Sequence, residues 1–127
     1  MEMDKNSRKK IGSFTDLVAW KEGHKLILMI YGITKKFPRE EVFGLTNQIR
    51  RAVISITSNI AEGFSRTGGD DKRKFYVIAL GSLTEVQNQL IIGRDLGYIL
   101  EDKFSQVAQQ TILVSKLING LRKINHP

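Results

Sequence analysis

Residues 44–63 read GLTNQIRRAVISITSNIAEG, a run whose apolar side chains recur at the spacing of one long helix. At about 100° per residue these side chains gather into a single stripe, and polar side chains occupy most of the remaining surface. The apolar stripe is Leu45, Ile49, Ala52, Ile56 and Ile60, and the polar surface is Gln48, Arg51, Ser55, Ser58, Asn59, Glu62 and Arg66. Because serine and asparagine are mediocre helix formers, their concentration here favours a helix that is contacted from more than one side.

The composition is that of one soluble domain. The chain has 127 residues, of which 41% are hydrophobic and 26% charged, and no apolar run is long enough to cross a bilayer. The absence of cysteine excludes disulfides, thiolate nucleophiles and cysteine zinc sites. A basic N-terminus without an apolar segment argues against export, so we expect a cytoplasmic protein with no membrane association.

Glycines and prolines divide the chain into four helical segments, predicted at residues 16–36, 46–66, 70–95 and 101–123. We expect Thr15 or Asp16, Thr46 and Asp70 to cap the first three helices. Gly97 suits the left-handed position after the third helix, with Tyr98 packing back against Ile92. Short turns favour an all-α, antiparallel up-down-up-down four-helix bundle over residues 14–124, preceded by a flexible basic leader, residues 1–13.

Each later helix has one predicted core stripe. These stripes are Phe75, Ala79, Leu83, Val86 and Leu90 in the third helix, and Phe104, Val107, Thr111, Val114, Ile118 and Leu121 in the fourth. The first helix has two. We assign Leu17, Trp20, Ile27, Leu28 and Tyr31 to the core, and Leu26, Ile30, Ile33 and Phe37, on nearly the opposite side, to a homo-oligomer interface.

Several spaced motifs resemble one known family. They are SFTDLVAW (13–20), FPREEVFGL (37–45), QIRRA (48–52), SNIAEG (58–63), ALGSLTE (79–85) and LGY (96–98). Together they are similar to the bacterial four-helix-bundle proteins encoded in intervening sequences of 23S rRNA genes. The chain departs from that family at Thr57, where proline is common, and at Leu100, where a small capping residue is usual.

The resemblance implies a ring-shaped homo-oligomer, typically a pentamer, without an assigned catalytic activity. A related branch serves diversity-generating retroelements, where it binds nucleic acid and a reverse transcriptase through a basic surface. The resemblance therefore implies self-association and a partner that is RNA, DNA or a nucleic-acid enzyme such as a reverse transcriptase.

The net charge of +7 permits such an anionic partner, although a solvated basic surface explains most of the charge. The candidate phosphate-binding residues are Arg50, Arg51, Arg66, Lys72, Arg73 and Lys74. A structural alternative places Arg51, Asn59 and Glu62 in an internal polar network. We assign Ser55, Asn59, Glu62 and Glu85 to such a network or to a subunit interface.

We predict no catalytic residue, no cofactor and no metal site. The Glu-x-x-His pattern of di-iron bundles is missing, because Lys21 and Lys123 precede His24 and His126 by three residues. His24 is expected to be partly buried, and Trp20 and Tyr31 to pack in the core rather than stack on bases. The leading prediction is a non-enzymatic, ring-forming protein that associates with RNA or a nucleic-acid-processing partner. Two alternatives are a protein–protein assembly scaffold and a metal-dependent hydrolase that uses Glu62 and Glu85.

Overall fold

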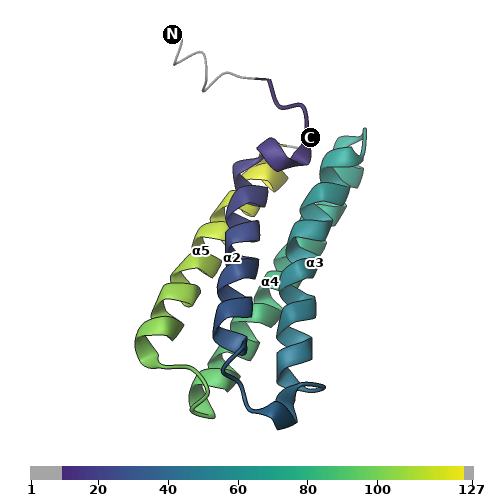
Figure 1. Ribbon diagram of the computed structural model, residues 1–127. Coiled ribbons are helices and arrows are strands. Elements are labelled where there is room, and N and C mark those ends of the chain that lie inside the picture. Colours follow the sequence, from purple (N-terminus) through teal and green to yellow (C-terminus); the bar gives the residue numbers. More distant parts are fainter. Residues whose placement is uncertain (1–9, 125–127) are drawn as a thin grey trace.

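Four helices run alternately up and down in the computed structural model of the chain (Figure 1). They are α2 (Val18–Thr34), α3 (Leu45–Ser65), α4 (Gly69–Asp95) and α5 (Glu101–Ile124). Two short 3-10 helices, η1 (Phe14–Asp16) and η2 (Arg39–Glu41), precede α2 and α3. The structure describes residues 10–124, and these residues contain no strand. Most of the predicted leader, residues 1–13, lies outside the described residues. The all-α four-helix bundle is confirmed.

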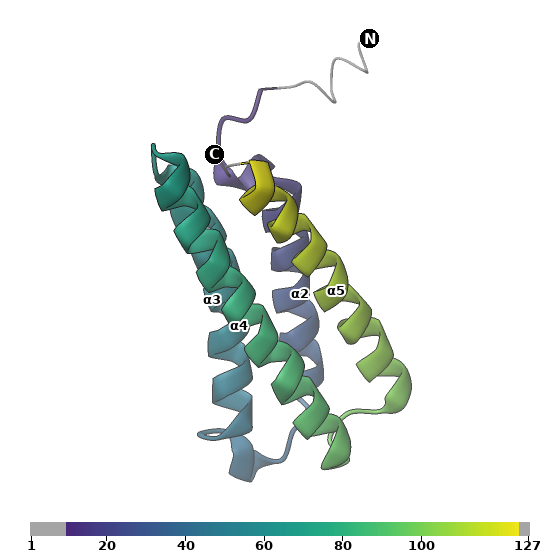
Figure 2. The ribbon, with the colours of Figure 1, turned by 180° about the vertical axis from the view of Figure 1, so that it is seen from behind.

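Contacts between neighbouring helices fix their directions. Ser55 of α3 meets Ser82 of α4, and Gly63, later in α3, meets Tyr76, earlier in α4. Such a pairing requires α3 and α4 to be antiparallel. Figure 2 shows the same alternation from behind, with α4 and α5 in front of α2 and α3.

The start of α2 differs from the prediction. Ser13, rather than Thr15 or Asp16, caps the first turn: its hydroxyl accepts a hydrogen bond from the Thr15 amide, and the Asp16 carboxylate accepts from the Ser13 amide at 3.2 Å. This reciprocal capping box stabilises η1. The helix proper then begins at Val18 and ends at Thr34, before the predicted limit of Lys36.

The predicted caps of α3 and α4 are also wrong. Glu41 caps α3, because its carboxylate accepts a hydrogen bond from the Leu45 amide at 3.1 Å, while Thr46 is buried inside the helix. Asp70 lies in the first turn of α4, which begins at Gly69. The negative charge of Asp70 in this position still stabilises the helix through its interaction with the helix dipole. The third helix of the bundle thus starts one residue earlier than its aspartates indicate.

The end of α4 matches the prediction in backbone form. Gly97 has a φ of 80°, and the Tyr98 amide donates to the Gly93 carbonyl at 2.9 Å. This bond and the left-handed glycine make a Schellman motif. The Tyr98 ring lies 5.4 Å from the ring of Phe37, whereas Ile92 is exposed. The turn therefore ties the end of α4 to the end of α2.

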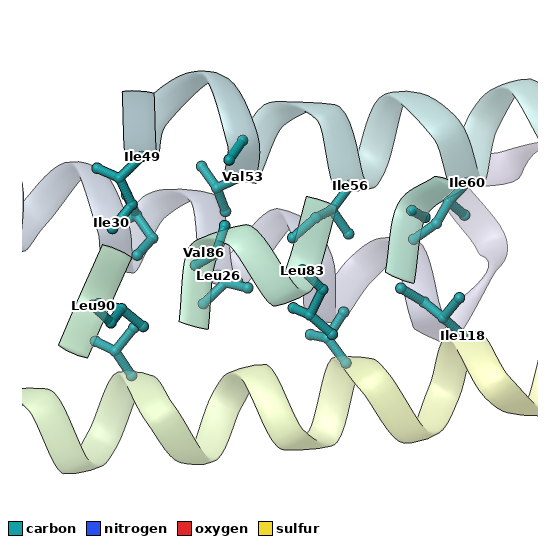
Figure 3. Packing of buried hydrophobic residues seen from close by; sticks show 14 of the residues in the cluster. Leu26, Ile30, Ile49, Val53, Ile56, Ile60, Leu83, Val86, Leu90 and Ile118 are labelled. Carbon is teal, nitrogen blue, oxygen red and sulfur yellow. The ribbon is translucent and has the colours of Figure 1, made fainter. Parts of the chain in front are cut away.

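The core runs the length of the bundle and is filled by branched aliphatic side chains (Figure 3). The predicted apolar stripes of α3, α4 and α5 point into this core, except for one residue. Two further apolar residues that were not in the predicted stripes, Val53 and Tyr76, are also buried, whereas Phe75 lies outside the core with its ring under the Arg66 guanidinium at 4.7 Å. The helix α3 is unbroken at Thr57, a residue that keeps the backbone amide which a proline would lack.

The deeply buried face of α2 is the one that was assigned to the oligomer interface. Leu26 and Ile30 are 0% exposed within the single chain, whereas Leu28, assigned to the core, is 61% exposed. The other core assignments are in part confirmed: Leu17 is buried, and Trp20 and Ile27 are half-buried against the core. Gly23 lies on the same face as Leu26 and lets α3 approach closely, because a Cβ at Gly23 would lie 2.9 Å from Cγ2 of Thr57.

The predicted oligomer interface is therefore wrong. Leu26, Ile30 and Phe37 are buried in the core of their own chain, and Ile33 is half-buried against that core. A second copy of the chain has no access to the three buried side chains. Any homo-oligomer must use other residues.

Candidate nucleic-acid interface

The six predicted phosphate-binding residues do not form one patch. Arg50 and Arg51 lie in the first turns of α3, whereas Arg66, Lys72, Arg73 and Lys74 lie at the α3–α4 turn. At a rise of about 1.5 Å per residue, Arg51 and Arg66 are about 22 Å apart along the helix axis. The sequence prediction thus combines two separate groups of cations.

Arg50 has a structural role between α2 and α3. Its Nε donates to the Thr34 hydroxyl at 2.9 Å, and its guanidinium lies 4.3 Å from the centre of the Tyr31 ring. Thr34 in turn donates to the Ile30 carbonyl at 2.7 Å. This chain of contacts holds the end of α2 against α3, so Arg50 is not a free cation.

Three of the four residues at the α3–α4 turn are also in contacts. Arg66 pairs with Glu62 at 2.8 Å, and Arg73 pairs with Asp70 at 2.9 Å. The Lys72 ammonium donates to the Phe64 carbonyl at 2.7 Å, which satisfies an end carbonyl of α3. Only Lys74 of this group, and Arg51 of the other, are exposed without a side-chain hydrogen bond or ion pair to the described residues.

The predicted polar network divides in two. Asn59 donates to the Ser55 carbonyl at 2.8 Å, and the Ser55 hydroxyl shares a 2.8 Å hydrogen bond with Ser82. This part of the network joins α3 to α4 through Ser82, which was not among the predicted network residues. Arg51 and Glu85 instead line an open polar depression of about 860 Å³ on the outside of the same helix pair.

The carboxylate pair needed for a hydrolase does not form. Because Ser55 is opposite Ser82, Glu85 is level with Ala52, and Glu62 lies about 15 Å further along the bundle. Glu62 is bound to Arg66 instead. Within residues 10–124 no three histidine or acidic side chains cluster as metal ligands would. The hydrolase alternative, in the form that uses these two residues, is wrong.

His24 is stacked on Trp20, which is half-buried against the core. Their ring centroids are 5.0 Å apart, with the planes 16° from parallel, and Trp20 also meets Phe14 edge-on at 5.5 Å. His24 itself is exposed, so its predicted partial burial is wrong. His126 lies outside the described residues.

Four of the free cations lie on the outward side of α2 and of the two residues that follow it. We call Lys21, Lys25, Lys35 and Lys36 the lysine stripe. All four are exposed, and none makes a side-chain hydrogen bond or an ion pair with residues 10–124. The one acidic residue of α2, Glu22, is turned toward α5, where its carboxylate accepts from Gln110 at 2.9 Å. The positive charge of this face is therefore uncompensated on its own helix.

The lysine stripe was missed because its members are spread along the sequence. Lys21 and Lys25 are four residues apart, and that helical spacing was the signal available. Lys21 and Lys25 are one turn apart, at about 6 Å, where like charges repel by a few tenths of a kcal/mol. Two neighbouring ammonium groups at this spacing suit the phosphates of one nucleic-acid backbone.

Exposed apolar side chains gather at the end of the bundle that holds the α2–α3 and α4–α5 connections. This apolar end comprises Val42, Phe43, Leu96 and Leu100, and Phe43 is 92% exposed. The Tyr98 hydroxyl donates to the Glu41 carboxylate at 3.0 Å and so joins the two connections. That hydrogen bond, with a smaller contribution from burial, raises the pKa of Tyr98.

None of the helices within residues 10–124 combines the length and the apolar character that a membrane span requires.

The sequence profile of the 23S rRNA-intervening sequence protein family matches residues 15–120. The chain therefore belongs to this family. Its fold is similar to the crystal structure of a protein of unknown function from the S23 ribosomal protein family of Bacteroides thetaiotaomicron. That structure has a TM-score of 0.77 and 21% sequence identity, and the match covers 84% of this chain and 99% of the other. No curated protein matches the sequence.

Proposed function

We propose that this member of the 23S rRNA-intervening sequence protein family is a non-enzymatic, ring-forming homo-oligomer that associates with RNA or with a nucleic-acid-processing partner. The observation that carries the nucleic-acid part is the lysine stripe: four exposed ammonium groups along α2 and the two residues after it, without acidic partners among the described residues. Such a surface attracts phosphate without reading sequence. DNA and a reverse transcriptase are the other partners that the family resemblance suggests.

Assembly would strengthen this attraction. A ring repeats the lysine stripe in every copy, and each copy has a net charge of +7. The summed field of several copies raises both the association rate and the affinity for a polyanion. Binding by such a surface weakens steeply as salt concentration rises.

The apolar end supports self-association. Phe43 is 92% exposed and Leu100 72% exposed, and burial of large apolar side chains between copies would stabilise an oligomer. The subunit count of five comes from the family resemblance. Because the residues first assigned to an interface are buried, the apolar end takes their place in the proposal.

Light scattering of the purified protein, recorded with its ultraviolet absorbance spectrum, tests both parts. We expect a mass that is a multiple of the 14.4 kDa chain and copurified nucleic acid that is removed by high salt. A mass of one chain at high protein concentration would overturn the ring. Failure to bind structured RNA at low salt would overturn the nucleic-acid role.

A protein assembly scaffold without nucleic-acid binding is the second candidate, and the exposed Phe43 favours it. The variant Phe43→Ser separates the two functions. If the apolar end serves only self-association, this change lowers the mass but leaves RNA binding by the remaining protomers measurable. If Phe43→Ser abolishes capture of a protein partner after nuclease treatment, and the lysine variants have no effect, the scaffold is the better account.

A further inference from the structure

A cavity lies between α2 and the beginning of α5. It has a volume of about 370 Å³ and is lined by the last turns of α2, the α4–α5 connection and the first turns of α5. Figures 1 and 2 both draw α5 leaning away from α2 toward this end of the bundle. The volume falls within the range of about 300–1,000 Å³ that is usual for small-molecule sites.

The inner surface of the cavity is apolar. Val107 and Ile99 are buried in the core cluster, and Met29 and Ile33 are half-buried beside them. Gly32 leaves the space open, because a Cβ built at this position meets no atom within 4 Å. A ligand that enters here would bury an apolar body.

The rim of the cavity is positively charged. Lys36 and Lys103 line it, and neither makes an ion pair with residues 10–124. At this end of the bundle both carboxylate oxygens of Glu41 accept hydrogen bonds, from Leu45 and Tyr98. Two free ammonium groups over an apolar floor match a ligand with one anionic group.

We propose that this cavity binds a medium-chain carboxylate, with its alkyl chain against Val107 and Ile99 and its carboxylate between Lys36 and Lys103. The site goes beyond the proposed function, although Lys36 also belongs to the lysine stripe and Leu100, which lines the cavity, belongs to the apolar end. Affinity depends on chain length, because each buried CH₂ changes it about fourfold. The two ammonium groups at the rim favour a ligand with an anionic head group over one with a cationic head group.

Calorimetric titration with decanoate tests the site. We expect decanoate to bind, octanoate to bind about fifteenfold more weakly, and decyltrimethylammonium, with a tail of the same length and the opposite charge, to bind far more weakly than decanoate. In the methyl NMR spectrum, decanoate should shift Ile33 and Ile99 and leave the exposed Ile54 unchanged. Equal binding of the two decyl compounds would overturn the proposal, as would shifts confined to Ile54.

Filling the cavity provides the matched variants. Gly32→Leu should weaken decanoate binding by at least about tenfold, with Gly32→Ala intermediate. Gly81→Leu should leave it unchanged, because Gly81 is an exposed position of α4 with the same free space around its Cβ. Circular dichroism shows whether each variant is folded. Unchanged decanoate binding in a folded Gly32→Leu protein would overturn the site.

The charged rim is tested separately with Lys103→Gln, which is outside the lysine stripe. Decanoate affinity should fall about threefold while RNA binding stays unchanged. A second copy of the chain is the competing occupant. If Gly32→Leu changes the mass in light scattering and decanoate does not bind the wild type, the cavity belongs to an interface and the ligand proposal is wrong.

Discussion

The α3–α4 pair and the α2–α5 pair are packed in opposite ways. The axes of α3 and α4 approach closely because small residues lie at their contact. Gly63 of α3 lies against the Tyr76 ring of α4, and the hydroxyls of Ser55 and Ser82 share a hydrogen bond. Between α2 and α5, a long polar side chain, Gln110, reaches across to Glu22, and a cavity remains at one end.

The two helix pairs also differ in how many of their cations have partners within the chain. Around the tight pair, most of the cations that the sequence singles out are held by carboxylates, carbonyls or rings, as Arg66 and Lys72 are. Around the loose pair, the lysines of α2 and the cavity rim have no partner among the described residues. Most of the candidate cations of α3 and α4 are therefore occupied, whereas the lysines of α2 and of the cavity rim are available to ligands.

The largest expected effect tests which face of α2 belongs to the core. Leu26→Ala removes a fully buried side chain, so we expect a loss of about 3 kcal/mol in the free energy of unfolding. Leu28→Ala, on the exposed face, is the matched control and should cost less than about 0.5 kcal/mol. Urea denaturation measures both. Equal losses would restore the opposite assignment of the two faces.

The next effect tests the close approach of α3 and α4. A Cβ at Gly63 would lie 2.7 Å from the Tyr76 ring and 3.2 Å from the Lys72 carbonyl oxygen. Gly63→Ala should therefore destabilise the protein by about 2 kcal/mol, as overpacking does. The same change at the exposed Gly81 should stabilise it by up to about 1 kcal/mol. Stabilisation by both variants would contradict the tight interface.

The loose pair should respond in the opposite direction. Gly32→Ala places its Cβ in free space, so its helix propensity should raise the free energy of unfolding by about 0.7 kcal/mol. The measurement is the urea midpoint at an unchanged m-value. A clear loss of stability would mean that α5 lies closer to α2 than the structure has it.

The smallest expected effect is a pH dependence at the link between the two connections. The Glu41 hydrogen bond raises the pKa of Tyr98 in the folded state above the ordinary value of about 10. A raised folded pKa contributes stability that is fully present below the unfolded pKa and is lost as pH rises through the folded pKa. Wild type should thus lose more stability above about pH 10 than Tyr98→Phe does. Parallel curves would contradict this role of Glu41.

Helical periodicity predicted most of the fold. The stripe of Ile49, Ile56 and Ile60 is apolar on one side only, so its burial follows directly from the pattern. Gly97 was predictable for another reason, since a turn with positive φ favours glycine. These signals are local, and the tertiary structure agrees with them.

Periodicity could have decided between the two apolar faces of α2. Leu26 and Leu28 lie on opposite sides of one helix, and Lys21 and Lys25 share the side of Leu28, so their charges mark that side as the solvent side. The close contact of Gly23 with Thr57 of α3 was not predictable, because it exists only in three dimensions. The cap supplied by Glu41 is similar, because its side chain reaches four residues ahead from a 3-10 turn that the sequence pattern does not indicate.

The candidate site was predictable only in its net charge. A sequence cluster such as Lys72-Arg73-Lys74 attracts notice, yet its first two members are in contacts at the α3–α4 turn. Lys21 and Lys25, which remain free, are separated in the sequence and become neighbours only on the surface of α2. Which cations are free depends on where carboxylates and carbonyls lie, and the sequence does not give those distances.

The most direct test of this account is the salt dependence of RNA binding in two charge-matched double variants. Lys21→Gln with Lys25→Gln removes two members of the lysine stripe, and Arg66→Gln with Arg73→Gln removes two cations that pair with carboxylates. We predict that the lysine variant weakens binding and lowers the slope of log affinity against log salt by about 2, while the arginine variant leaves the slope unchanged. An unchanged slope in the lysine variant, with a reduced slope in the arginine variant, would contradict the account.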